Sequence, residues 1–151
     1  MGAYRNILVA VDSSKASAKG LREALRLAKA EGARLFILHV VDEYQAFAAV
    51  DATLAGNAAA DLVTMLKTDG ERLLAKAKKS ADAAGVRATT VLREMLSGPA
   101  ADPIVREARK AGADLIVLGT HGRRGVRRLV LGSDAEQVVR TATVPVLLVR
   151  E

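Results

Sequence analysis

The chain has 151 residues, of which 50% are hydrophobic, and it contains no cysteine. This length suits one globular domain over residues 1–151, and the missing thiols exclude disulfides, thiolate metal sites and cysteine nucleophiles. The 23 basic and 17 acidic residues give a net charge of +6, but four arginines within residues 123–128 account for most of it, because the charge without them is +2.

The first third of the chain predicts two strands separated by a helix. Residues 7–11 form a continuous apolar run, which is typical of a strand buried on both faces. Asp12, Ser13 and Ser14 follow it and can cap a helix over 15–31, which ends before Gly32. Residues 34–41 predict a second buried strand, and the small residues over 42–57 predict a long, mobile loop.

The rest of the chain continues this alternation. The predicted elements are a helix over 62–84 that ends at Gly85, a strand over 86–93, a helix opened by Pro99 or Pro103 and running to Lys110, a strand over 115–118, a helix over 134–141 and a strand over 144–149. Right-handed crossovers place helices on both sides of such a sheet. The order therefore predicts a single-domain α/β fold, a Rossmann-like open parallel five-stranded sheet with helices on both faces.

A glycine-rich segment follows the fourth predicted strand, with glycines at 119, 122, 125 and 132. Glycine lets the main chain approach a ligand, and successive N–H groups form a concave site for phosphate oxygens. Ser133 stands where the next helix begins, so it can both cap that helix and contact a phosphate. A glycine-rich loop after a strand is also often only a turn, and its spacing alone is weak evidence.

Ligands of parallel sheets bind beyond the carboxyl ends of the strands, where the strand order reverses. Three segments are expected to meet there, residues 11–13, residues 40–42 and the glycine-rich segment. Together they predict one crevice that holds a whole nucleotide.

These residues carry a family resemblance over nearly the whole chain. Gly119-x-x-Gly122, nine further residues and Gly132-Ser133, together with Asp12 after the first strand and Leu38-His39-Val40 in the second, resemble the ATP-binding branch of the universal stress protein family. The resemblance implies a fold like that of the adenine nucleotide alpha hydrolases.

The resemblance also implies roles for individual residues. Val40 would contact adenine through its backbone, and Gly119 would flank the ribose. The adenine and ribose end would be lined by Val11, Asp12 and Ser13. The phosphates would be surrounded by Thr120, His121, Gly122, Gly132, Ser133 and Asp134.

Charged residues complete the expected site. Asp12 and Asp134 would repel phosphate unless a cation intervenes, so we expect Mg²⁺ or Mn²⁺ with ATP rather than a metal site of the protein's own. Of the four arginines, Arg123 is our choice for clamping the γ-phosphate. We expect His121 to contact phosphate rather than to catalyse, and His39 to be a core imidazole hydrogen-bonded to the backbone.

The function expected from these features is an ATP-binding regulatory module of the stress response, whose occupancy alters residues 42–57 or a dimer surface. The alternative is a slow ATPase or phosphotransfer protein, but the chain offers no catalytic residue and lacks both the P-loop and the kinase signatures, so at most weak ATPase activity is expected. A nucleic-acid binder is a third possibility, which the 3% aromatic content does not favour.

The expected partners are ATP, unidentified proteins and a second copy of the chain. The resemblance implies a homodimer that pairs the last strand, over 144–149, across a two-fold axis, which would cover an apolar edge. The sequence shows neither a bilayer-spanning apolar stretch nor a signal-peptide pattern, so we expect a cytoplasmic protein with no membrane partner.

Overall fold

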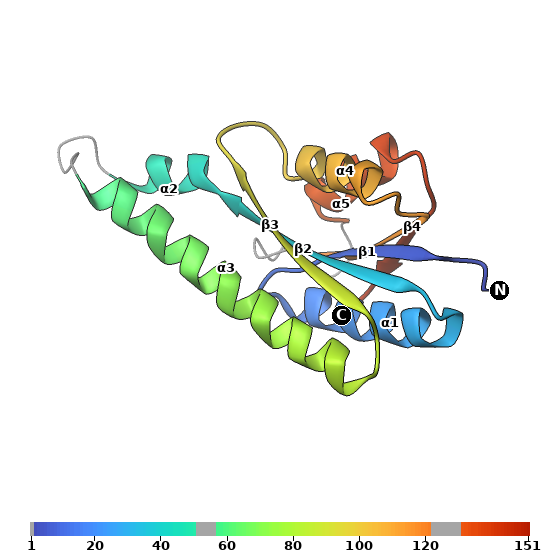
Figure 1. The fold of residues 1–151 in the computed structure, drawn as a ribbon. Helices are drawn as coiled ribbons and strands as arrows, with labels where there is room; N and C mark the ends of the chain where they lie inside the picture. Colours follow the sequence, from blue (N-terminus) through green and yellow to red (C-terminus); the bar gives the residue numbers. More distant parts are fainter. Residues whose placement is uncertain (1, 51–56, 122–130) are drawn as a thin grey trace.

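The sheet is built from five parallel strands. The computed structural model, which describes residues 2–50, 57–121 and 131–151, places them at β1 (Asn6–Ala10), β2 (Arg34–Asp42), β3 (Ala88–Met95), β4 (Leu115–Gly119) and β5 (Val146–Val149). Their order across the sheet is β3-β2-β1-β4-β5, so the chain runs to one side after β1 and crosses to the other side at β4 (Figure 1). The strand order therefore reverses between β1 and β4, and the predicted fold class is confirmed.

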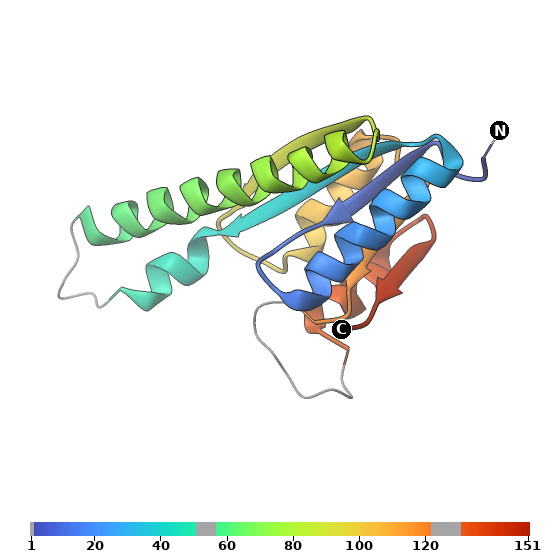
Figure 2. The same ribbon diagram turned by 90° about the horizontal axis from the view of Figure 1, so that it is seen from below.

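Helices cover both faces of this sheet. They are α1 (Lys15–Glu31), α2 (Glu43–Ala49), α3 (Asn57–Ala83), α4 (Ala101–Lys110) and α5 (Ser133–Thr141). α1 and α3 lie on one face and α4 and α5 on the other, while α2 and the start of α3 extend beyond the sheet (Figures 1 and 2). None of the helices in the described ranges is long and apolar enough to cross a membrane.

The central strand explains why the first apolar run has no polar alternation. Ile7 and Val9 pack under α1 and α3, whereas Leu8 packs toward α4 and α5, and all three side chains are 0% exposed. Burying side chains of this size contributes about 1.5–3 kcal/mol each. Because both faces of β1 are covered, an apolar residue is needed at each of these three positions.

The region predicted as a loop over 42–57 contains a helix. Asp42 ends β2 and caps α2, since its carboxylate accepts a hydrogen bond from the N–H of Gln45 at 3.1 Å. Ala46 of α2 is buried, so a short helix packs where the weak periodicity of small residues predicted none. Residues 51–56 of that prediction lie outside the described residues, and α3 begins at Asn57 rather than at 62.

Other boundaries also differ from the prediction. β3 starts two residues later and continues to Met95, because its pairing with β2 extends as far as Asp42. α4 begins at Ala101, so neither proline is its first residue. Pro103 lies in the first turn, where helical N–H groups have no partner and the missing donor costs little.

An ion triad ties α2 to the rest of the fold. Lys67 Nζ of α3 lies 3.0 Å from a carboxylate oxygen of Glu94 on β3 and 3.6 Å from one of Glu43 on α2. The hydrogen bond with Lys67 lowers the pKa of Glu94, whereas the hydrogen bond with Glu94 raises the pKa of Glu43. Lys67 therefore holds together two carboxylates that would otherwise repel each other.

Lys67→Met is expected to make the attachment of α2 depend on pH. Without the cation, ionised Glu43 and Glu94 repel each other at neutral pH. The pKa of Glu43 is raised, so acidification protonates Glu43, removes this repulsion and favours the contact between α2 and β3. Amide hydrogen exchange over 43–49, corrected for intrinsic rates, should be faster than in the native protein at about pH 7 and nearer to it at about pH 5. Lys76→Met, at an exposed position of the same helix, is the control. An equal change at both pH values would contradict the role of the triad.

Candidate functional site

The polar groups between β1 and α1 are hydrogen-bonded to one another. Ser14 is the N-cap of α1, and its Oγ accepts the N–H of Ser17 at 3.1 Å. Asp12 Oδ1 accepts the N–H of Ser14 at 2.7 Å, and the N–H of Asp12 donates to Ser17 Oγ at 2.7 Å. Of the three residues expected to cap this helix, Ser14 is therefore the cap, and Asp12 supports it from outside while exposed Ser13 lies between them.

Val11 is held by β2 on both of its main-chain groups. Its N–H donates to Leu38 O at 2.8 Å, and its carbonyl oxygen lies 2.8 Å from Nδ1 of His39. A carbonyl oxygen only accepts hydrogen bonds, so Nδ1 carries the proton. His39 is 7% exposed. The prediction of a core imidazole hydrogen-bonded to the backbone is confirmed.

β2 continues past the end of β1. The last β1 pair is Ala10 with Leu38, so residues 39–42, which we call the β2 overhang, have no β1 residue beside them. Leu38 O accepts from the β1 side, and residues two apart on a strand direct their N–H and C=O groups to the same edge. The N–H and C=O of Val40 therefore face the space beyond the end of β1.

The end of β4 packs directly on the start of α1. A Cβ added to Gly119 would lie 2.7 Å from the carbonyl carbon of Ala16 and 2.8 Å from the N of Ser17. One added to Gly20 would lie 3.4 Å from the N of Gly119. Glycine at 119 is thus required by the approach of α1, a contact between distant residues that the sequence alone does not show.

Thr120 and His121 extend this edge toward α5. The N–H of Thr120 donates to Val149 O at 2.9 Å, and Thr120 O accepts the N–H of Gly132 at 2.8 Å. The hydroxyl of Thr120 lies 3.0 Å from Nδ1 of His121. Nε2 of His121 is buried and has no hydrogen-bond partner among the described residues. A buried, unpaired ring nitrogen is costly and suits a site that a polar ligand completes.

A serine hydroxyl links the two strand ends. Ser14 Oγ donates to the carbonyl oxygen of His121 at 3.2 Å. This bond brings the segment after β1 beside the segment after β4. The sequence predicts that residues 11–13 meet the glycine-rich segment there, of which residues 122–130 lie outside the described residues. Ser17 is not among the residues predicted for the site, although the Ser-x-x-Ser spacing from Ser14 places a second hydroxyl in the first turn of α1.

The start of α5 differs from the expectation in one respect. Gly132 is the N-cap, with φ −59° and ψ 146°, and Ser133 is already helical and makes no capping hydrogen bond. The prediction that Ser133 caps the helix is wrong, because the cap lies one residue earlier. Asp134 and Glu136 occupy the first turn, where acidic side chains complement the helix dipole.

Part of the predicted site lies outside the described residues. Gly122 and Arg123 belong to 122–130, as do the other three arginines of that segment. Their assignment stays a prediction. Within the described ranges, no group of three or more His, Cys, Asp or Glu residues is arranged to hold a metal ion.

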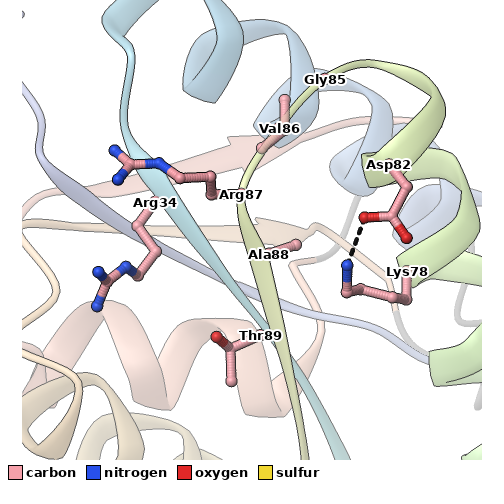
Figure 3. Close-up of a pocket in the computed structure, with 8 residues that line it drawn as sticks. All are labelled: Arg34, Lys78, Asp82, Gly85, Val86, Arg87, Ala88 and Thr89. Atoms are coloured by element: carbon pink, nitrogen blue, oxygen red, sulfur yellow. Dashed lines mark hydrogen bonds and ion pairs between the residues drawn. The ribbon is translucent and has the colours of Figure 1, made fainter.

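A hollow of about 570 Å³ lies at the opposite end of the sheet. Its lining includes Arg34, Arg87, Thr89 and the ion pair of Lys78 with Asp82. The two arginines lie on one side of β3 and the ion pair lies on the other (Figure 3). These residues belong to the amino ends of β2 and β3 and to the end of α3. The hollow is therefore separate from the edge that gathers the predicted site residues.

Known proteins resemble this chain over almost its whole length. It matches the universal stress protein family over residues 3–150. Universal stress protein MJ0531 of Methanocaldococcus jannaschii is 38% identical over 148 residues, which cover 98% of this chain and 83% of that protein. A solved structure from the universal stress protein family of Burkholderia pseudomallei is 34% identical, with a TM-score of 0.79 and coverage of 99% of this chain and 98% of that one.

A universal stress protein solved in complex with cAMP is 27% identical to this chain, with a TM-score of 0.64 and coverage of 99% of this chain and 98% of that one. The five-stranded parallel sheet agrees with the fold of these solved relatives. The chain belongs to the universal stress protein family.

Proposed function

We propose that the chain binds ATP together with Mg²⁺ or Mn²⁺ and acts as a nucleotide-dependent regulatory module of the stress response. The observation that carries this proposal is the β2 overhang, which presents the N–H and C=O of Val40 at the carboxyl edge of the sheet. A related universal stress protein has been solved with cAMP, another adenine nucleotide. The shared element of these ligands, adenine, is what the overhang is suited to recognise.

Adenine offers a ring-nitrogen acceptor next to an amino donor. A main-chain N–H and C=O from one residue provide the matching donor and acceptor, and Val40 directs both groups to the same side. Val11, Asp12 and Ser13 continue the edge from there toward β4. The ribose would then lie near Gly119, on the far side of β1 from Val40.

The phosphates would lie at the start of α5. Ser133 and the N–H groups that follow it form a helix N-terminus, which favours anions through free donors and the helix dipole, whereas the N–H of Gly132 already donates to Thr120 O. His121, whose Nε2 is unpaired among the described residues, follows Thr120, the residue whose carbonyl oxygen accepts the N–H of Gly132. Asp12 and Asp134 are negative, so a divalent cation shared with the phosphate oxygens would be held there and would offset their repulsion.

The helix next to the proposed adenine site, α2, favours a regulatory function over a catalytic one. α2 begins directly after the β2 overhang, and Lys67 connects it to α3 and β3. Tyr44 and Phe47 of α2 are 62% and 50% exposed. Occupancy at Val40 would thus reach an aromatic surface that a partner protein can read.

The proposal includes a homodimer through β5. β5 pairs with β4 on one side only and forms one edge of the sheet. Ile116 N–H donates to Pro145 O, so residue alternation directs the main-chain groups of Val146 and Leu148 away from β4. A second copy of the chain would supply their partners.

Acid extraction of the purified protein should release an adenine nucleotide, and ATP with Mg²⁺ should bind to the stripped protein by calorimetry. ATP that remains intact for hours while bound is the result expected of a regulatory module. Recovery of ADP after loading with ATP would favour the slow ATPase instead. Stripped protein that gives no heat with ATP or with other adenine nucleotides would contradict the proposed function.

Gly132→Val should weaken ATP binding by at least roughly tenfold without unfolding the protein. At φ −59° the main chain accepts any residue, so glycine is not required there by backbone conformation. A side chain would instead occupy space assigned to phosphate. Thr141→Val, at the other end of α5, is the matched control. Unchanged affinity in a folded Gly132→Val variant would remove the phosphates from this position.

Val146→Pro should convert the dimer to a monomer in sedimentation velocity. Proline removes an N–H that faces away from β4, so the internal sheet keeps its hydrogen bonds while the intermolecular pairing loses one. Val146→Ala keeps the N–H and is the control. A dimer that survives the proline would place the interface elsewhere.

A further inference from the structure

The imidazole of His39 occupies an acceptor that the sheet itself would otherwise use. Val11 N–H donates to Leu38 O, and in a parallel ladder the next bond runs from the N–H of Val40 to Val11 O. No such main-chain bond forms among the described residues; Nδ1–H of His39 donates to Val11 O instead, at 2.8 Å. A side chain has replaced the next rung of the ladder.

We infer that His39 is a positioning residue for base recognition, because its hydrogen bond to Val11 O stops the β1–β2 ladder and leaves the N–H of Val40 for the ligand. The inference rests on the proposed nucleotide site. It assigns to a core histidine the task of keeping a main-chain donor unpaired at the point where β1 ends. Its effect on the ligand passes through Val40, which it precedes in the chain.

The ring is fixed in this position from the opposite side by α3. A Cβ added to Gly70 would lie 2.6 Å from Cδ2 and 3.1 Å from Nε2 of His39, closer than side chains pack. It would also lie 3.0 Å from Cδ1 of Leu92. Gly70 therefore makes room for the imidazole, which is enclosed between α3 and the carbonyl of Val11.

The state of the Val40 amide tests the inference without any ligand. In nucleotide-free native protein, hydrogen exchange at the Val40 N–H, followed by NMR, should be fast relative to Leu38. In His39→Leu the carbonyl of Val11 becomes available to Val40, and the exchange should slow by roughly tenfold or more. In His39→Asn the side-chain amide places a donor near the position of Nδ1, so the exchange should stay native-like. A Val40 amide already protected in the native protein, or unaffected by His39→Leu, would overturn the inference.

Affinity provides the second readout. The Kd for ATP should rise by roughly tenfold in His39→Leu and stay within about threefold of native in His39→Asn. Equal affinity in all three proteins, or equal loss in both variants, would overturn the positioning role. If the native protein binds no adenine nucleotide, the proposed function fails, and the exchange at Val40 still decides whether His39 controls the ladder.

Gly70→Ala, on α3, disturbs the same hydrogen bond between His39 and Val11 O without changing His39. It tests the inference even if His39→Leu does not fold. The added methyl must displace the ring from Val11 O, so the exchange at Val40 should slow as it does in His39→Leu. Adding His39→Asn should restore the native rate, since the shorter side chain leaves room for the methyl. Glu71→Ala, at the exposed neighbouring position, is the control. A Gly70→Ala variant with native exchange at Val40 would contradict the inference.

Discussion

The unequal length of β1 and β2 is the constraint on which the rest of this structure depends. β1 is the central strand, yet it ends at Ala10, while β2 continues to Asp42. The β2 overhang therefore has main-chain groups with no strand beside them on the β1 side. Main-chain groups without a neighbouring strand need another hydrogen-bond partner. The imidazole of His39 donates to the carbonyl oxygen of Val11, and the N–H and C=O of Val40 face the carboxyl edge of the sheet.

Glycine sets how closely helices approach that edge. Gly119 lets α1 lie against the end of β4, and Gly70 lets α3 lie against the ring of His39. Interiors are packed too tightly for a methyl group to be absorbed at these distances. The contact at Gly119 fixes main chain directly, and the contact at Gly70 fixes a ring that is hydrogen-bonded to the main chain at Val11 O. The proposed site, which would read adenine through the backbone and phosphate through N–H groups, requires main chain held in this way.

The same edge also carries the features suited to signalling. The β2 overhang passes directly into α2, and the two carboxylates that surround Lys67 belong to α2 and β3. Residues 41 and 42 alone separate Val40 from the start of α2, and Lys67 connects that helix to α3 and β3. Tyr44 and Phe47 make the outer surface of that helix aromatic. The proposed binding function and the proposed regulatory function thus share one segment.

The sequence by itself determined the order of the five strands and of the four longer helices between them, the burial of both faces of β1 and the hydrogen-bonded role of His39. The spacing of apolar residues, the glycines that end helices and the ends of strands are local properties of the sequence. It could not determine α2 or the cap of α5 at Gly132, since short helices depend on packing more than on propensity. Nor could it show which edge Val40 faces or why Gly119 is needed. Those depend on strand register and helix approach, which only the tertiary structure decides, because the residues that meet there are far apart in the chain.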